Sequence, residues 1–433
     1  MNKIIMMAAA VLAAAAFVPE AAALPSFARQ TGMACSACHQ QHFPILNKFG
    51  REFKASGYTM MGAQGKVEGD HLSIPDTLNG AILVKVKYQK DNTAATDNVA
   101  TGTANTLGDG QLQFGDELSL FFGGRVGDNI GFMFEGNTVA VAGSLMAGLK
   151  IPIMFDAGET RLSVIPFTTD TLGVQYGYEL SSGGVMRANR WAEHRRETSA
   201  VQYNADQNNV PLSNANTGAA TGFALVAQND IGYINFTKWS PNYAMGGNGS
   251  SINSFDMSSR YFRVAATPSV RDWDMVVGFG VMGGESQVTD TSLVPPVVAS
   301  LWETRQTFAD FQAHGSVGNN DLGVYAQYAK APVVTTAAVG SIYGAGTTDR
   351  KAFTLGADYS VIPNVLSFGA AYRKASNGAV ATANGDDALT FTAVYDLAMN
   401  VALHANYSKY KGTSRNAAGD QTSLYTLQLE AGW

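Results

Sequence analysis

The feature of this sequence that most constrains its fold is an alternation of apolar and polar residues that recurs from Leu78 to the C-terminal Trp433. Alternating stretches of about ten residues are separated by clusters of Gly, Asn, Asp and Thr. In the last stretch, one face carries Tyr425, Leu427, Leu429, Ala431 and Trp433, and the other carries Thr426, Gln428, Glu430 and Gly432. This two-residue period, repeated over such a length, is typical of a transmembrane β-barrel with a polar lumen.

A soluble β-sandwich shows the same alternation in each strand and is the main alternative fold. Two further observations favour the barrel. Charged residues make up only 15% of the chain while glycine numbers 46, as in glycine-rich β-structure. The last strand also ends on its own aromatic residue, Trp433, which resembles the C-terminal signature of bacterial outer-membrane proteins.

The number of strands follows from where the alternation breaks. Counting back from Trp433, we predict strands near 422–433, 399–410, 387–396, 364–374, 350–361, 320–331, 303–316, 271–284, 258–268, 231–240 and 221–229. Six more segments, near 78–90, 108–125, 128–141, 144–156, 159–169 and 171–181, would make seventeen. Bacterial barrels have even counts, short periplasmic turns and longer outer loops. Parity is restored by one bent strand over 159–181, broken at Pro166, or by assigning 171–181 to an outer loop, so we predict about sixteen antiparallel strands.

The first residues, 1–23, have the features of a secretory signal peptide: a lysine, an apolar run and a small-residue cleavage site at Ala21 to Ala23. No later stretch approaches the roughly 20 apolar residues that a membrane-spanning helix needs. A membrane role must therefore use strands. The formal charge of −6 argues against a nucleic-acid partner.

Residues 24–77 contain the only two cysteines, in the run Cys35-Ser36-Ala37-Cys38-His39. This is the attachment motif of a c-type haem, in which two thiols bond the haem vinyl groups and the adjacent histidine binds the iron. The alternatives are a strained disulfide, a thioredoxin-like pair or half of a zinc site, which would need further ligands. We expect one covalently attached haem, with Cys35, Cys38 and His39 as its protein ligands.

The second axial ligand is less constrained by the sequence. Met60, Met61 and His71 are candidates, and we favour Met60 with His71 as the alternative. After His39, the spacing of Phe43, Leu46, Phe49 and Phe53 predicts a helix with one apolar face, which we expect to lie on the porphyrin. The opposite face carries Lys48, Arg51 and Lys54, for which a solvated basic surface is the simplest interpretation.

Residues 78–433 are predicted to form the barrel, and the preceding α-helical segment is expected to plug its lumen or lie at its periplasmic side. His314 and His404 face the lumen by alternation, and we expect both to be hydrogen-bonded wall residues. The expected fold is thus an all-β transmembrane barrel with a small monohaem cytochrome c segment.

The run from Leu24 to Met33, the haem motif, His42-Phe43-Pro44, and Phe49-Gly50-Arg51 to Met60 closely resemble the Cyc2 family of outer-membrane fused cytochrome-porins from iron-oxidising bacteria. The close match covers roughly residues 24–61, and the barrel matches in architecture, length and ending. The resemblance implies an oxidoreductase that takes single electrons from extracellular Fe(II) and passes them through the haem to a periplasmic cytochrome. Neither composition nor spacing indicates iron as the substrate.

Two other functions fit the same residues. One is a solute porin in which the haem segment plugs or gates the pore. The other is an electron conduit that runs outward, since the direction depends on a haem potential that the sequence does not give. No spacing of His, Asp and Glu marks a binding site for Fe(II), so no catalytic residue beyond the haem ligands is predicted.

Overall fold

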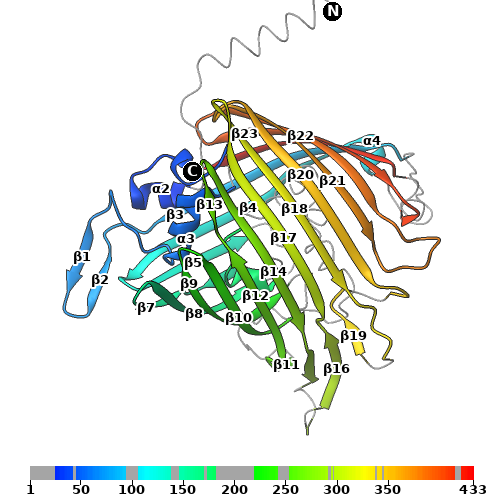
Figure 1. Cartoon of the computed structure of the whole chain (residues 1–433), viewed down its shortest axis with the longest axis horizontal. Coiled ribbons are helices and arrows are strands. Elements are labelled where there is room, and N and C mark those ends of the chain that lie inside the picture. Colours follow the sequence, from blue (N-terminus) through cyan, green and yellow to red (C-terminus); the bar gives the residue numbers. More distant parts are fainter. Residues whose placement is uncertain are drawn as a thin grey trace, which may run out of the picture.

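The computed structural model describes residues 25–41, 45–93, 106–137, 146–169, 173–181, 219–241, 253–290, 294–295, 297–336, 339–343, 346–414 and 421–433. Its main body is a closed antiparallel β-barrel (Figure 1). The barrel closes where β24 (Ser423–Gly432) pairs with β3 (Gly80–Asp91), the last strand against the first. The predicted signal peptide, 1–23, lies outside the described residues.

The other barrel strands follow in chain order. They are β4 (Gln111–Gly127), β5 (Ile130–Asn137), β6 (Met146–Lys150), β7 (Ile153–Ala157), β8 (Thr160–Thr169), β9 (Ala220–Asn229), β10 (Gly232–Ser240), β12 (Ser259–Ala266), β13 (Ser269–Val270), β14 (Trp273–Gly283), β17 (Gln306–Val317), β18 (Asn320–Ala331), β20 (Arg350–Ile362), β21 (Leu366–Ser376), β22 (Asp387–Ala398) and β23 (Val401–Lys411). The eleven strands predicted from residue 221 onward are confirmed, with boundaries within three residues.

In the described part of the chain these segments form sixteen wall strands, as predicted. β6 and β7 are two halves of one strand, since both pair with β5 and β8, and β13 is a two-residue piece of the β12–β14 hairpin. The bent strand over 159–181 is wrong, because β8 runs unbroken through Pro166, which pairs with Phe223. The wall strand made of β6 and β7 is the interrupted one, and its break lies at Pro152, beside Pro166. Neither proline has a backbone N–H, so neither can donate a hydrogen bond to the neighbouring strand.

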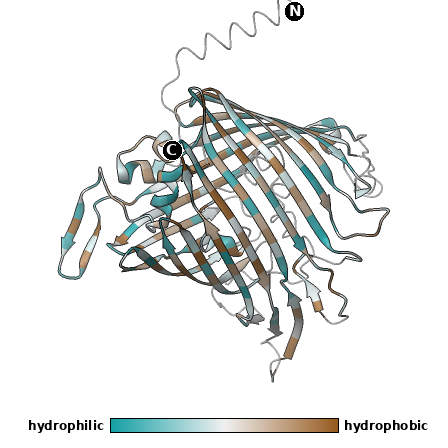
Figure 2. Cartoon of the chain, viewed as in Figure 1, coloured by the Kyte–Doolittle hydropathy of each residue, from teal (hydrophilic) through white to brown (hydrophobic). Residues whose placement is uncertain are grey.

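The two faces of the wall differ as the alternation predicts (Figure 2). Large apolar side chains point outward and are exposed, among them Phe223, Leu225, Ile234, Phe236, Phe262, Phe279, Phe353, Phe368, Phe391 and Leu427. Buried polar side chains point inward, among them Asn235, Thr237, Arg263, His314, Thr354, Asp358, Arg373 and His404. An apolar outer surface around a polar interior is that of a barrel set in an outer membrane. The inward orientation of His314 and His404 is confirmed.

The C-terminal residue takes part in closing the barrel. Trp433 exchanges two backbone hydrogen bonds with Ile82 of β3, at 2.7 and 3.0 Å. Its side chain is exposed on the outer face, like those of Tyr425, Leu427 and Leu429 before it. The predicted faces of the last strand are therefore correct.

The short turns between barrel strands all lie at one end of the barrel, which by the rule for bacterial barrels is the periplasmic end. The N-terminal segment lies across this end beside the C terminus (Figure 1). It comprises α2 (Pro25–Thr31), η2 (Cys35–Ala37), α3 (Lys48–Ala55) and a hairpin of β1 (Lys66–Gly69) and β2 (Leu72–Pro75). Contacts with several wall strands hold it there. A Cβ on Gly123 of β4 would meet the ring of Phe27, and Ile45 packs with Tyr325 and Val394.

Smaller elements extend from the other end of the barrel. β11 (Asn253–Phe255), β15 (Glu285–Asp290), β16 (Val297–Glu303) and β19 (Val339–Ser341) form a four-stranded sheet, and α4 (Thr106–Asp109) precedes β4. Among the described residues, none of the helices is long and apolar enough to cross a membrane.

Candidate functional site

The predicted haem motif forms a tight turn at the start of the docked segment. The backbone N–H groups of Cys38 and His39 both donate to the carbonyl of Cys35, at 3.0 and 2.9 Å. Both cysteines are half-buried, and they are not joined in a disulfide. Burial, and then the nearby Cys35, raise the pKa of the Cys38 thiol. Two accessible thiols on one short turn match what thioether formation with a haem requires.

His39 is oriented by the chain that follows it. Its Nδ1 lies 3.3 Å from the carbonyl oxygen of Ile45, and His39 forms an isolated β-bridge with Leu46. An Nδ1–H that donates to a backbone carbonyl fixes the tautomer in which Nε2 is a metal ligand. The residues present therefore fit a c-type haem, with Cys35 and Cys38 as anchors and His39 as the proximal ligand.

The start of α3 packs directly on the motif. The Asn47 side chain accepts from the N–H of Gly50 at 2.9 Å and donates to the carbonyl of Ala37 at 3.0 Å. The Asn47 N–H donates to the carbonyl of Cys38 at 3.0 Å. A Cβ on Gly50 would lie 2.1 Å from the Cys38 carbonyl oxygen, so only glycine allows this approach.

Replacing Gly50 by alanine should therefore push α3 away from the haem motif. We expect a loss of roughly 1–3 kcal/mol in the stability of the segment, because backbone cannot yield as a side chain does. Haem content per protein and the thermal midpoint of the haem absorbance should both fall. Gly69→Ala is the matched control, since a Cβ there meets nothing within 4 Å. Equal haem content and midpoint in the two variants would contradict the close-packing interpretation.

The two candidates for the second axial ligand lie in different surroundings. Met60 is half-buried, and the Gln30 side chain of α2 donates to the carbonyls of Tyr58 and Met60 at 2.6 and 2.7 Å. His71 is exposed in the turn of the β1–β2 hairpin, with a φ of 61°. Buried Arg125 anchors that hairpin through Ser73. These placements do not test which residue binds the iron, so Met60 and His71 both remain predictions.

Part of the apolar side of α3 packs against α2. Phe53 is 4% exposed and packs against Phe27 and Tyr58, with ring centroids 5.0 and 5.9 Å away, while Phe27 stacks on Tyr58 at 5.1 Å. The predicted helix begins only at Lys48, and Phe43 lies outside the described residues. Phe53 thus joins α2 to α3, and the expected contact of this helix with a porphyrin stays a prediction.

The basic side of α3 is only partly a solvated surface. Arg51 is 4% exposed and forms an ion pair with Asp274 of β14, 2.5 Å apart. Lys48, which is exposed, reaches Ser269 at 3.0 Å. The expectation for Arg51 was wrong, because its partner lies 223 residues further along the chain. Arg51 fastens the N-terminal segment to the barrel wall.

Residues 173–181 fold into the barrel instead of forming its wall. They contain a 3-10 turn, η3 (Val174–Tyr176), and bury Val174, Tyr176, Tyr178 and Leu180. Tyr178 and Leu180 belong to one apolar cluster with Ala55 of α3. The Tyr178 hydroxyl donates to Gln228 at 2.5 Å, and Gln228 donates to Glu52 of α3 at 3.3 Å. Residues 173–181, called the inward segment below, therefore link the wall to the N-terminal segment.

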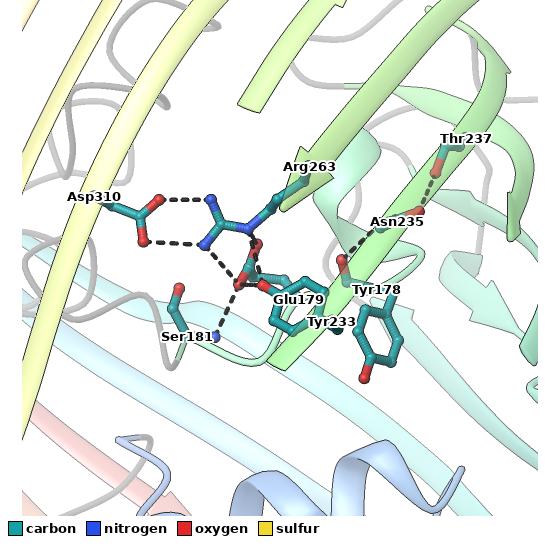
Figure 3. Close-up of polar contacts among 8 residues, drawn as sticks. All are labelled: Tyr178, Glu179, Ser181, Tyr233, Asn235, Thr237, Arg263 and Asp310. Carbon is teal, nitrogen blue, oxygen red and sulfur yellow. Dashed lines mark hydrogen bonds and ion pairs between the residues drawn. The ribbon is translucent and has the colours of Figure 1, made fainter. Parts of the chain in front are cut away.

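A buried arginine fixes the end of the inward segment (Figure 3). Arg263 of β12 is 1% exposed and donates twice to Asp310 of β17, at 2.6 and 3.0 Å. Its opposite side contacts Glu179, 2.8 Å from the nearer carboxylate oxygen. Tyr233 of β10 donates to Glu179 at 2.6 Å. One cation thus joins two carboxylates from distant parts of the chain.

Replacing Glu179 by glutamine should loosen the inward segment while keeping its shape. We expect a cost of about 1–3 kcal/mol, because a buried charge-assisted hydrogen bond becomes a neutral one. Protease cleavage between 173 and 181 should become faster in membranes, with Glu159→Gln in the exposed β7–β8 turn as control. Unchanged cleavage would show that Arg263 does not hold the segment.

A ligand cluster for Fe(II) was not expected from the sequence. Within the described ranges, no group of three or more His, Cys, Asp and Glu side chains is placed to hold a metal ion. His314 Nε2 lies 3.1 Å from the Tyr325 hydroxyl, as expected of a hydrogen-bonded wall residue. The expectation that Fe(II) has no stable ligand cluster therefore stays a prediction.

Comparison with known proteins finds likeness in structure alone. No family model and no curated protein matches the sequence. The structure is similar to outer-membrane OmpT of Vibrio cholerae (11% identity, 85% of this chain, 100% of that chain, TM-score 0.44). It is also similar to an anion-selective porin from Comamonas acidovorans (14%, 82%, 99%, TM-score 0.46) and to the channel DcaP of Acinetobacter baumannii (10%, 82%, 97%, TM-score 0.42). At these identities and TM-scores we draw no conclusion on activity from the likeness.

Proposed function

We propose that this protein is an outer-membrane cytochrome-porin that oxidises extracellular Fe(II) and passes single electrons to a periplasmic electron carrier. The observation that supports this most is the position of the haem motif. Cys35, Cys38 and an oriented His39 lie in a segment docked across the mouth of a closed membrane barrel. Membrane lipid prevents electrons from passing between the two sides. A porin needs no redox centre and a soluble cytochrome needs no barrel, so a redox centre in the mouth of a barrel is suited to electron transfer across the membrane.

The residues of the segment have distinct roles in this proposal. Cys35 and Cys38 anchor the haem covalently, and His39 binds its iron with Nε2 while Nδ1–H points at the Ile45 carbonyl. Bound c-type haem supplies a one-electron couple. Met60, held by Gln30, is the proposed second ligand, and a thioether on iron raises the potential relative to a second histidine. The ring cluster of Phe27, Phe53 and Tyr58 keeps water from this side of the segment.

Fe(II) as the donor and a periplasmic cytochrome as the acceptor come from the resemblance of residues 24–61 to iron-oxidising cytochrome-porins. Polar side chains line the lumen between the outer end and the segment, as the passage of a hydrated metal ion would require. Electron transfer needs only brief contact near the haem edge, so a permanent Fe(II) site is unnecessary.

A solute porin with a haem-bearing gate is the second candidate, and the polar inner wall is the observation that favours it. Planar-bilayer recording separates the two functions. Large steady currents through haem-loaded protein would support the porin, whereas a closed or nearly closed barrel supports the electron conduit. Outward electron transfer uses the same parts and differs in the potentials of the partners.

The experiment that tests the proposed cofactor is a redox titration of the purified protein followed by absorbance. We expect a c-type spectrum that survives denaturation, a single one-electron transition, and a methionine-to-iron band in the oxidised form that is lost in Met60→Ala. A spectrum without covalent haem would refute the proposal. A band that persists in Met60→Ala would refute only the second ligand.

A further inference from the structure

A buried carboxylate on the inner wall, Asp358 of β20, has no cationic partner among the described residues. It is 1% exposed, and none of the ion pairs in the described part of the chain includes it. Other buried carboxylates of the inner wall, such as Asp310 and Asp386, are paired with arginines. An isolated buried carboxylate is strongly unfavourable unless a proton or a cation neutralises it.

Glycines on both neighbouring strands leave room beside Asp358. The register pairs Asp358 with Gly323 of β18 and with Gly369 of β21. A Cβ on Gly369 would lie 2.1 Å from Asp358 Oδ1 and 2.7 Å from Thr392 Cγ2, so both side chains converge over this glycine. On the other side, the Tyr325 hydroxyl covers Gly323 and is engaged with His314.

The N-terminal segment contributes Gln41 to the surroundings of Asp358. The Gln41 side-chain nitrogen donates to the backbone carbonyls of Asp321 at 3.0 Å and Asp358 at 2.8 Å. Gln41 is 2% exposed, and its backbone takes the left-handed conformation, with φ at 62°. These two bonds hold its amide oxygen beside Asp358.

Four buried oxygens on Asp358 and the residues around it, including the residue two positions further along β20, have no hydrogen-bond partner among the described residues. They are Gln41 Oε1, Asp358 Oδ2, Ser360 Oγ and Thr392 Oγ1. Their side chains belong to residues that are at least nine-tenths buried. Buried polar atoms are nearly always paired, so these unpaired oxygens require a partner.

The chemistry of the four atoms selects the kind of partner. One carboxylate, one amide oxygen and two hydroxyls, with no imidazole or thiolate, are ligands for a hard cation. A single negative charge is balanced by a single positive charge, which favours an alkali cation over a divalent one. We propose that Asp358, Thr392, Ser360 and Gln41 bind a sodium ion where the haem segment meets the barrel wall. This site is independent of haem chemistry and tethers the segment through Gln41.

The test is a sodium NMR titration of the full-length, haem-loaded protein in detergent, with choline chloride holding the ionic strength constant. We expect saturable broadening of the sodium signal in the natural protein. Asp358→Asn should lose at least about tenfold in affinity, because the charged ligand is replaced by a neutral one. Heat-dependent gel mobility reports whether the variant barrel is folded.

Two threonines on one strand provide a matched pair of variants. Thr392→Val removes an unpaired hydroxyl of the proposed site and should weaken sodium binding severalfold. Thr390→Val, two residues away on the same face, removes a hydroxyl that is bonded to Ser408 at 2.8 Å and should leave sodium binding unchanged. This pair decides the question if Asp358→Asn fails to fold.

Three results would overturn the site. The absence of saturable broadening in the natural protein would mean that water or a proton occupies this place. Unchanged affinity in folded Asp358→Asn would place the ion elsewhere. Equal effects of Thr392→Val and Thr390→Val would mean that the hydroxyl of Thr392 is no ligand.

Discussion

Replacing Cys35 or Cys38 by alanine is expected to abolish stable covalent haem attachment at the altered position, and replacing both is expected to leave protein without covalent haem. The reason is chemical, since each thioether needs its own thiol and the chain has no other cysteine. Haem staining of a denaturing gel, normalised to the amount of protein, measures the effect. The double variant should give no stained band.

The barrel should survive this change, because the cysteines lie in the docked segment and not in the wall. Folded double variant should therefore reach the outer membrane and keep its heat-dependent gel mobility. Ser36→Ala, between the two cysteines and exposed, is the matched control and should retain full haem staining. Covalent haem in the double variant would refute the assignment of this motif.

Replacing Arg51 by alanine is expected to open the mouth of the barrel. The change leaves Asp274 largely buried without its cation, and removing one partner of a buried ion pair costs about 3–5 kcal/mol. Since Asp274 is 16% exposed, we expect the lower end of this range. Single-channel conductance in planar bilayers should rise severalfold as the haem segment undocks, with haem still attached.

Two further variants make this prediction specific. Lys48→Ala, one turn away on the exposed side of α3, should change conductance little, because its contact with Ser269 is a single surface hydrogen bond. The charge swap Arg51→Asp with Asp274→Arg should restore part of the closure. Closed channels in Arg51→Ala would mean that other contacts hold the segment, and equal opening in Lys48→Ala would mean that the effect is not specific to the ion pair.

The barrel itself was predictable from the sequence because one physical period governs it. Each wall strand has one face toward lipid and one toward the lumen, so alternation appears in nearly every strand, as in Phe391 outward and Thr392 inward. Turn residues then set the boundaries. Even Trp433, which pairs with Ile82, lies on the face that the alternation predicts.

The inward segment shows where alternation misleads. Val174, Tyr176, Tyr178 and Leu180 alternate as a strand does, yet the segment begins with a 3-10 turn over Val174–Tyr176 and all four side chains are buried inside the barrel. Their partners, Ala55 and Gln228, come from remote parts of the chain. Strand parity, together with the rule that long loops lie on the outer side, argued against a seventeenth wall strand.

The part of the candidate site that consists of consecutive residues was predictable from the sequence. The parts that join residues far apart in the chain were not. The haem motif is contained in five residues and was assigned from spacing. The ion pair of Arg51 with Asp274, and the contacts of Arg263 with Glu179 and Asp310, join residues that are 47 to 223 positions apart. The residue types alone do not distinguish these paired charges from solvent-exposed charges, because the partners meet only when the barrel wall has formed.

The central claim, that electrons from Fe(II) enter the haem of the docked segment, is tested most directly by rapid mixing. Oxidised, haem-loaded protein is mixed with excess Fe(II) under anaerobic conditions while the haem absorbance is followed. We predict that the spectrum changes to that of the reduced haem, at a rate that increases with Fe(II) concentration. Haem that stays oxidised in the presence of Fe(II), in protein that dithionite reduces fully, would contradict the account.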